Sequence, residues 1–330
     1  MSTQPVVARP LAWLLALVVA WLLTACGEPV RPPLSVGMNA WVGYDPLVLA
    51  RDRQQIDHQL IKVVELATAS ETQRHLKNGL LDSAALTLDE VLRLRDGGLD
   101  LRVVAVLDAS HGADVVMAMP NVQHVEQLRG KTVAVEDTSV GALMLDRMLQ
   151  SAGMSRSDVV VLHEEASLHQ DLLRSGRVAA VVSYAPLSGI LANAGYRPLF
   201  SSDRMPGEIL DVLAVRAAVL HERPEAVQAL LLAWQSGLEL LELDPVGAAA
   251  SLAPGTDLSS DLYLKVISGL KFYSPAQSLA AMEGTPPELL VSAQRVANLI
   301  ADIGLVDAPP SLHDLFDASP ARAALGRGGP

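Results

Sequence analysis

Short runs of alternating or continuous apolar residues recur along the chain, separated by stretches with helical periodicity. Residues 61–67 alternate polar and apolar side chains, as a half-buried strand does, and 70–78 begin with a capping residue and end before Gly79. In residues 139–152 the apolar side chains fall on one helical face, and Gly153 supplies the C-terminal stop. Strands that alternate with helices predict βαβ units, and therefore an α/β fold built on mostly parallel sheets.

The same patterns predict the remaining elements. Strands are expected at 34–39, 83–87, 101–107, 115–119, 132–136, 158–162, 179–183 and 209–215, and helices at 46–55, 88–95, 168–175 and 186–194. Two strand–helix sets, roughly 34–115 and 125–205, imply two lobes. After Arg216 the signals are almost purely helical, at 224–243, 244–254, 258–270 and 286–304. A helical block of this kind needs apolar surface to pack on, and we expect it to cover the first lobe.

The first residues have the layout of an export signal. Arg9 precedes an apolar run over 11–23, which is shorter than the ~20 residues of a typical spanning helix, and small residues follow it. The sequence LTAC, which ends in Cys26, resembles a bacterial lipobox, in which the cysteine is lipidated and becomes the mature N-terminus. We therefore expect a signal peptide over 1–25, lipidation at Cys26 and a stiff Pro-containing linker over 26–33. Cys26 is the only cysteine, so no internal disulfide can form.

Charge and composition narrow the range of partners. The chain carries 25 Lys and Arg against 37 Asp and Glu, a formal net charge of −12. This acidic balance argues against nucleic acid, whose binding depends on Lys and Arg contacts to phosphate, and against electrostatic adhesion to anionic lipid. Membrane attachment would then come from the N-terminal lipid alone. With 50% hydrophobic residues the chain can bury a substantial core, although only 4% are aromatic.

Motifs that would indicate an enzyme or a metal site are missing or incomplete. Gly-Lys-Thr at 130–132 lacks the earlier P-loop glycine and runs into a strand, so we interpret it as a tight turn. His163-Glu164-Glu165 has its next histidine at His169, not at the i+4 position of a zinc-protease helix, which favours exposed polar residues at a strand–helix junction. We therefore predict a protein that is not an enzyme and that uses no cofactor and no metal.

Polar and aromatic residues at the ends of the predicted strands are the candidates for ligand binding, because ligands of α/β sheets lie beyond the carboxyl ends of the strands. These candidates are Trp41, Tyr44, Thr68, Thr87, Glu136, Thr138, Ser139 and Tyr184. Thr138 and Ser139 begin a helix whose free N–H groups would receive a polar group, although simple capping also explains them. Glu136 would either meet a ligand amine or face water.

Three segments carry a resemblance to a known family. GMNAWVGYDPLVLARD at 37–52, LRGKTVAVEDTSVGALML at 128–145 and RPLFSSDRMPGEILDVLAV at 197–215 look like parts of the nitrate/sulfonate/taurine-type solute-binding proteins of bacterial ABC importers, a family with thiamin-precursor-binding relatives. The likeness extends in order over most of 34–305. It implies a type II periplasmic-binding-protein fold, in which two α/β lobes are joined by two crossovers and close on the solute like a hinge.

The resemblance also implies roles for individual residues. It places the two crossovers near 108–119 and 205–215, with Asp211 on the return crossover. It places Trp41 and Tyr44 in a pocket-lining loop and Tyr184 at a pocket edge. Thr138 and Ser139 would lie at the helix start that holds a polar or anionic head-group. The departure from the family concerns charge, because Glu136, Asp89 and Asp211 lie near a site without an evident Arg or Lys. A zwitterionic or heterocyclic organic solute therefore fits better than a small anion such as nitrate. Trp41 would bind a flat ring or an ammonium group by stacking or cation–π contact.

These observations predict a monomeric, lipid-anchored solute-binding protein that faces the periplasm or the exterior. It would deliver a small organic solute, such as a sulfonate, a zwitterion or a pyrimidine-like heterocycle, to an ABC permease and its ATPase. We expect lobe I to comprise 34–115 and 211–321, lobe II to comprise 116–210, and 322–330 to be a disordered tail. Two alternatives stay open: a sensing or scaffold lipoprotein that docks on a receptor, and a pyrimidine-synthase-type enzyme, against which the export signal argues.

Overall fold

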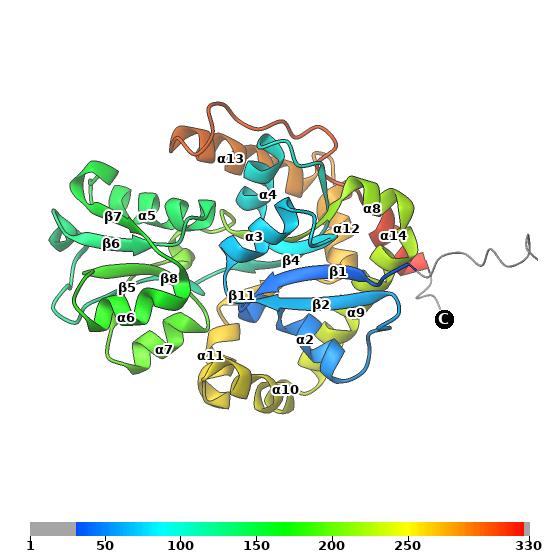
Figure 1. The fold of residues 1–330 in the computed structure, drawn as a ribbon, viewed down its shortest axis with the longest axis horizontal. Helices are drawn as coiled ribbons and strands as arrows, with labels where there is room; N and C mark the ends of the chain where they lie inside the picture. The colour runs from blue at the N-terminus through cyan, green and yellow to red at the C-terminus, as the bar shows by residue number, and fades with distance from the viewer. Residues whose placement is uncertain (1–30, 327–330) are drawn as a thin grey trace, which may run out of the picture. The chain divides into compact units, whose positions relative to one another are not determined.

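Two separate β-sheets, each with helices packed around it, form the framework of the protein (Figure 1). The computed structural model describes residues 31–326, and from Leu34 onward they belong to one compact unit. The expected signal peptide over 1–25 and Cys26 lie outside the described residues. None of the described helices is long and apolar enough to cross a membrane.

The first sheet has six strands in the order β11-β4-β10-β3-β1-β2. Its strands are β1 (Leu34–Asn39), β2 (Ile61–Leu66), β3 (Ser83–Thr87), β4 (Leu101–Ser110), β10 (Leu210–Arg216) and β11 (Leu270–Phe272), and α2 (Asp45–Asp52), α3 (Ala69–Lys77) and α4 (Leu88–Asp96) follow the first three strands. Every residue of β3 is buried, as expected for a central strand covered on both faces. Because β1 is parallel to both β2 and β3, the carboxyl ends of these three strands meet at one edge of the sheet.

The second sheet has five strands in the order β7-β6-β8-β5-β9. Its elements are β5 (Asp114–Ala118), β6 (Thr132–Val135), α5 (Ser139–Ser151), β7 (Val160–His163), α6 (His169–Arg174), β8 (Ala180–Tyr184), α7 (Leu187–Asn193) and β9 (Arg197–Ser201). The apolar face of α5 packs on this sheet and supplies a large part of its core, including Leu143, Met144 and Met148. The amphipathic pattern that predicted this helix thus also specifies which face is buried.

The chain passes between the two sheets twice. It leaves the first sheet at the end of β4, Ser110, and enters the second at the start of β5, Asp114. It returns between the end of β9, Ser201, and the start of β10, Leu210. Both passages fall where the resemblance placed the two crossovers.

The α/β architecture agrees with the prediction, but both sheets are mixed, not mostly parallel. In the first sheet β10 runs antiparallel to β3 and β4, and in the second β5 runs antiparallel to β8 and β9. The cause is the pair of crossovers, since β10 and β5 enter their sheets from the opposite side. The periodicity of a single strand carries no information on the direction of its partner.

Helices after β10 cover the first sheet, as the sequence suggested. They are α8 (Ala217–Glu222), α9 (Pro224–Leu243), α10 (Pro245–Leu252), α11 (Ser260–Ile267), α12 (Pro275–Glu283), α13 (Glu288–Asp302) and α14 (Ser319–Gly326). The long helix α9 packs on α2, and a Cβ added at Gly237 would lie 1.8 Å from the Pro46 carbonyl oxygen, so only glycine permits this approach. One contact departs from the expectation, because Leu299 of α13 packs in the core of the second sheet.

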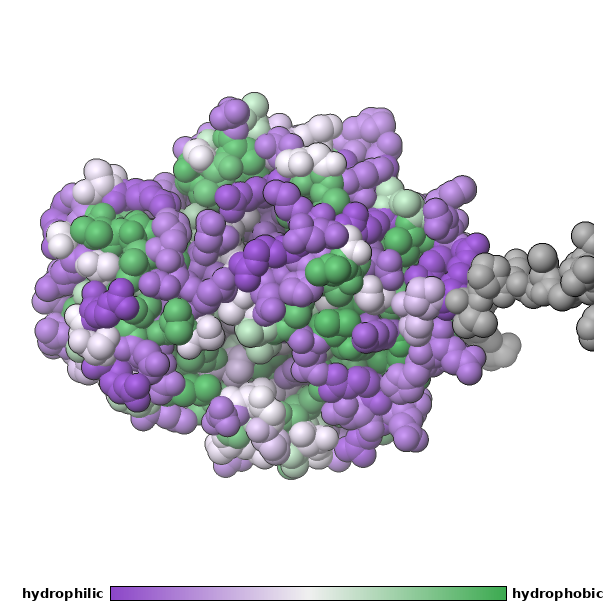
Figure 2. All heavy atoms as spheres, in the orientation of Figure 1, coloured by the Kyte–Doolittle hydropathy of each residue, from purple (hydrophilic) through white to green (hydrophobic). Residues whose placement is uncertain are grey.

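Five elements were not predicted: β9, α8, β11, α12 and α14. The helix α14 extends to Gly326, so residues 322–326 of the expected disordered tail are helical, held because Ala321 and Ala324 are buried against the first core. Short 3-10 turns occur at Val42–Tyr44, Val125–Leu128, Arg156–Asp158, Ala166–Leu168, Ser202–Arg204 and Ala253–Thr256. On the face seen in Figure 2, hydrophilic residues dominate and apolar residues gather in small separate groups.

Candidate functional site

A small cavity lies where strand ends from the two sheets face each other. Its volume is about 30 Å³, room for one or two water-sized groups. The lining residues are Asn39, Trp41, Tyr44, Ala69, Thr87, Glu90, Asp114, Val140, Tyr184 and Asp211. Asn39, Thr87 and Tyr184 are the last residues of β1, β3 and β8. The cavity therefore lies beyond carboxyl strand ends, where α/β proteins place their ligands.

Strand register brings the carboxyl groups of the cavity to these strand ends. Asp211 of β10 lies opposite Thr87 of β3 and opposite Asp108 of β4. In the second sheet Asp114 of β5 lies opposite Tyr184 of β8. Because β10 and β5 are antiparallel to β3 and β8, their first residues meet the last residues of those strands. Each sheet thus contributes an aspartate from one crossover.

The segment Trp41-Val42-Gly43-Tyr44 forms one wall of the cavity. The rings of Trp41 and Tyr184 meet edge-to-face, with centroids 6.0 Å apart and planes at 76°. Tyr44 is buried and donates its hydroxyl to Asp211 Oδ1. A Cβ at Gly43 would lie 2.2 Å from the indole nitrogen of Trp41 and 2.3 Å from Asp108 Oδ2. Glycine is required here because the indole and this carboxylate occupy the space of a side chain.

Burial shifts the protonation of the carboxyl groups around the cavity. It raises the pKa of Asp108 and of Asp114 to about 7, and the hydroxyl of Ser110 offsets part of the effect on Asp114. Burial also raises the pKa of Asp211 and of Glu90 well above the usual range, and neighbouring carboxylates add to both shifts. The cause is the same throughout, since ionised carboxylates lose their hydration without gaining a positive partner.

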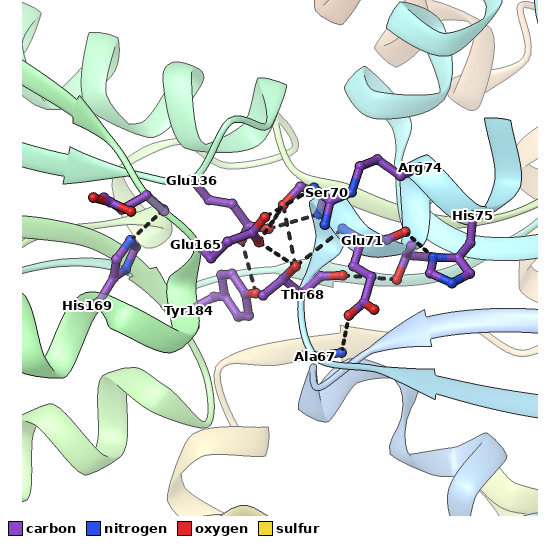
Figure 3. Close-up of polar contacts among 12 residues, drawn as sticks. Ala67, Thr68, Ser70, Glu71, Arg74, His75, Glu136, Glu165, His169 and Tyr184 are labelled. Carbon is purple, nitrogen blue, oxygen red and sulfur yellow. Dashed lines mark hydrogen bonds and ion pairs between the residues drawn. The ribbon is translucent and has the colours of Figure 1, made fainter. Parts of the chain in front are cut away.

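A second cluster of polar side chains joins helix α3 of the first sheet to the second sheet (Figure 3). Glu136 Oε1 accepts hydrogen bonds from the backbone N–H of Ser70 at 2.8 Å and from its hydroxyl. Glu165 Oε2 accepts from Thr68 Oγ1 at 2.6 Å and from Ser70 Oγ at 2.8 Å, and Arg74 reaches Glu165 Oε1 at 3.1 Å. The start of α3, which favours negative charge, is therefore occupied by carboxylates of the protein itself.

Two interpretations from the sequence are corrected by this cluster. Glu136 is only 3% exposed, so it does not face water, and its second oxygen accepts from Tyr184 Oη at 3.2 Å. Glu165 is not a free polar residue at a strand–helix junction, because it contacts three side chains of α3 and its cap. His169 is fully buried, and burial lowers its pKa to about 4.

The start of helix α5 is also covered by protein groups. Thr138 caps the helix by accepting from the Gly141 N–H at 3.2 Å. Ser139 is fully buried, and its hydroxyl lies close to Asp89 of α4, where it lowers the carboxyl pKa that burial raises to about 6. Neither residue lines the cavity.

Five of the nine residues expected at the site line the cavity: Trp41, Tyr44, Thr87, Tyr184 and Asp211. The other four, Thr68, Glu136, Thr138 and Ser139, contact protein groups next to it. Sequence reasoning missed Glu90 and Asp114. Thr87-x-x-Glu90 has the spacing of a capping box, and Glu90 Oε2 does accept from the Thr87 N–H at 3.1 Å, so the local signal pointed to capping. Asp114 had no local signal, because only the strand pairing places it.

A wider groove of about 940 Å³ borders the polar cluster, between α3, α4 and the loops after β6 and β7. It is lined by charges of both signs, among them Arg74, Lys77, Arg93 and Glu164. Surface side chains contribute much of its lining, such as Arg74 with 58% of the side chain exposed. We place the candidate site at the smaller cavity because buried aromatic and polar groups of both sheets converge there. Within residues 31–326 no group of three or more metal-ligating side chains is arranged to hold a metal ion.

The comparisons with known proteins agree with this geometry. The NMT1-like family matches residues 27–253, and the chain belongs to that family. No curated protein matches the chain by sequence.

Solved structures show the same fold at low identity. The alkanesulfonate-binding protein SsuA from Xanthomonas axonopodis pv. citri bound to MOPS is similar with a TM-score of 0.72 and 19% identity over 88% of this chain and 99% of that one. The periplasmic nitrate-binding protein NrtA from Synechocystis PCC 6803 is similar with a TM-score of 0.71 and 12% identity, over 92% of this chain and 90% of that one. The desulfurization enzyme DSZB is similar with a TM-score of 0.64 and 15% identity, over 90% of this chain and 100% of that one. The chain therefore has the two-lobed fold of the periplasmic binding proteins.

Proposed function

We propose that this protein is the extracytoplasmic solute-binding component of an ABC importer and that it has no catalytic role. The observation that carries the proposal is the cavity at the meeting point of the two sheets, where Trp41, Tyr44 and Asp211 of one sheet face Asp114 and Tyr184 of the other. Lining from both sheets means that a solute bound there would hold them together. Membership of the NMT1-like family and the fold shared with the alkanesulfonate-binding protein SsuA and the nitrate-binding protein NrtA support this role.

We further propose that the first sheet and its helices form lobe I, that the second sheet and its helices form lobe II, and that solute binding closes one lobe on the other. The expected lobe boundaries at 115/116 and 210/211 shift accordingly, because Asp114 already begins β5 of the second sheet and Leu210 already begins β10 of the first. The contacts of Ser70 with Glu136 and of Thr68 with Glu165 join the two proposed lobes. A contact of this kind stabilises the closed arrangement over the open one. A bound solute would also shift the equilibrium between the open and closed arrangements toward the closed one, because it touches both lobes.

Anchoring and delivery complete the proposal. The lipobox ending in Cys26 would give a lipidated, monomeric protein held at a membrane and facing the periplasm or exterior, which passes its solute to a permease and its ATPase. A sensing lipoprotein would bind solute in the same way and dock on a receptor instead. Uptake assays in cells that lack this protein separate the two, since only an importer component is needed for accumulation of the solute.

Trp41 offers a direct test of the site. We expect Trp41→Phe to weaken solute binding at least about tenfold, because the indole provides both the wall opposite Tyr184 and an N–H that the smaller ring lacks. The measurement is native mass spectrometry of the exported protein, followed by thermal shifts with organic solutes. A solute at 100 times its dissociation constant adds ~2.7 kcal/mol of stability.

Trp234→Phe is the matched control. Trp234 is fully buried in the first core, away from the cavity, and donates its indole N–H to the Tyr273 carbonyl at 2.8 Å. This variant should lose stability and keep its solute affinity. If Trp41→Phe keeps full affinity, the proposed binding site is wrong.

A further inference from the structure

Six buried carboxyl groups gather at and around the cavity: Asp89, Glu90, Asp108, Asp114, Glu136 and Asp211. None of the ion pairs among residues 31–326 includes any of the six. Arg93 acts on the group only at a distance, by lowering the pKa of Asp89 against the rise caused by burial. Burying one carboxylate without a positive partner is costly, so six together indicate that a positive charge belongs in this region.

Two of these groups present unused oxygens at the cavity. Asp114 and Asp211 line it, are 6% and 2% exposed, and come from different sheets. Asp114 Oδ2 and Asp211 Oδ2 are buried and accept from no N–H or hydroxyl donor of the protein, and the nearest neighbour of the Asp211 carboxyl besides Tyr44 is the carboxyl group of Asp108. Buried polar atoms of folded proteins are nearly always paired, and the exceptions mark unfilled sites or functional strain. These two oxygens are therefore positioned to accept hydrogen bonds from a donor inside the cavity.

The positions where an anion would bind are already filled. The start of α3 holds the carboxylates of Glu136 and Glu165, and the start of α5 faces Asp89 beside Ser139. The carboxyl groups of Glu90, Asp114 and Asp211 line the cavity and offer no positive partner to a sulfonate or nitrate. Aromatic side chains complete the wall, and the π-faces of Trp and Tyr attract cations.

We propose that the solute is an organic amine, whose protonated ammonium group is held by Asp114 and Asp211 and walled by Trp41, Tyr44 and Tyr184. This inference rests on the proposed function, since it names the chemical class of the solute for that same site. An –NH₃⁺ group has three donors and no acceptor, which suits two carboxylates with free oxygens. A volume of about 30 Å³ fits the ammonium group itself.

The test is a matched series of probes on the protein as the cell exports it: butylammonium, putrescine, neutral 1-butanol, and the anions propanesulfonate and nitrate. Thermal shifts and calorimetry are read at pH 8, and native mass spectrometry identifies any amine that co-purifies. Stabilisation by an amine, without stabilisation by 1-butanol or either anion, supports the proposal. Binding of either anion or of 1-butanol, without binding of an amine, overturns the amine assignment and leaves the solute-binding function standing. No bound solute and no shift with any probe overturns both.

Asp114→Asn and Asp211→Asn test the two carboxylates separately. Each should weaken amine binding at least about 30-fold, the effect of removing one partner from a buried charge pair. Asp302→Asn, an exposed residue at the end of α13, is the control and should keep wild-type affinity. If both site variants fold and bind an amine within about threefold of wild type, the assignment is wrong. The two variants alter different sheets, so failure of one to fold leaves the other as the test.

Discussion

Two sets of carboxylates near the contact between the two sheets differ in what their oxygens contact. Glu136 and Glu165 accept hydrogen bonds from a backbone N–H and from hydroxyls at the start of α3. Asp114 and Asp211, which are both buried, each keep an oxygen without a donor. The first set is complete within the protein, so it acts as a latch between the two sheets. The second set is incomplete, which is the condition of a binding site before its ligand arrives.

The largest expected difference between the two sets appears in the pH dependence of stability. Burial raises the pKa of Asp45, Asp108 and Asp114 from 3.8 to about 7. Between pH 4 and 7 the folded protein therefore binds more protons than the unfolded chain, and the free energy of unfolding falls as pH rises. One such pKa shift corresponds to a change on the order of 4 kcal/mol in the free energy of unfolding. His169, whose pKa burial lowers to about 4, opposes the trend over part of this range.

We expect the melting temperature of the solute-free protein to be at least ~4 °C lower at pH 8 than at pH 5. An amine should reverse this trend, because it binds the ionised carboxylates and so stabilises the protein more at pH 8. The other ionisable groups facing the cavity are Glu90, Asp211, Tyr44 and Tyr184, and Glu136 contacts Tyr184 beside it. Differential scanning calorimetry at the two pH values, with and without putrescine, measures both effects. A solute-free protein that is more stable at pH 8 would contradict the assignment of ionised, unpaired aspartates.

Removing a carboxylate from the latch gives the next largest effect. Glu136→Ala leaves the Ser70 N–H and hydroxyl without their acceptor, and should destabilise the closed arrangement by about 2 kcal/mol. Hydrogen exchange at the Ser70 amide should accelerate, and small-angle scattering should report a larger radius of gyration. Glu71→Ala is the control, since Glu71 accepts from the Ala67 N–H within its own helix start and does not reach the second sheet. If Glu136→Ala and Glu71→Ala change hydrogen exchange and the radius of gyration equally, the contact between Glu136 and Ser70 does not hold the two sheets together.

Neutralising a carboxylate of the cavity should have the opposite sign. Asp114→Asn removes a buried charge that lacks a partner, so the solute-free protein should become more stable by up to about 1 kcal/mol at pH 8. The thermal midpoint of the variant is compared with that of Asp302→Asn, which lies on the surface. A loss of stability in Asp114→Asn alone would show that this carboxylate serves the fold.

The smallest effect is expected at the edge of the latch. The pair between Arg74 and Glu165 has 58% and 37% of its side chains exposed, so Arg74→Ala should cost less than ~0.5 kcal/mol, and added salt should reduce this cost. Urea unfolding at low and high salt measures it. A large, salt-independent loss would mean that the surface pair, and not the buried hydrogen bonds of Ser70, holds the two sheets together.

The sequence alone determined most of the helices and strands and which face of each is buried. Alternation in β2, the apolar face of α5 and the glycine stops predicted most strands and helices within a few residues, because burial of successive side chains follows the local period of the backbone. The same reasoning identified Trp41, Tyr44 and Thr87, which directly follow or end parallel strands of the first sheet. It failed for β11 and β9, which are short and half-exposed and so carry little periodic signal.

Only the tertiary structure decided which charges meet. Asp114 and Asp211 begin or nearly begin antiparallel strands, and nothing in their local sequence states that they face one cavity. Likewise Glu136 and Ser70 lie on different sheets, and only folding turns a possible ligand group into a latch. The physical reason is that periodicity is a property of one element, whereas strand direction and register are set by pairing between distant segments. The acidic character of the site therefore emerges from register, and the aromatic wall from the sequence.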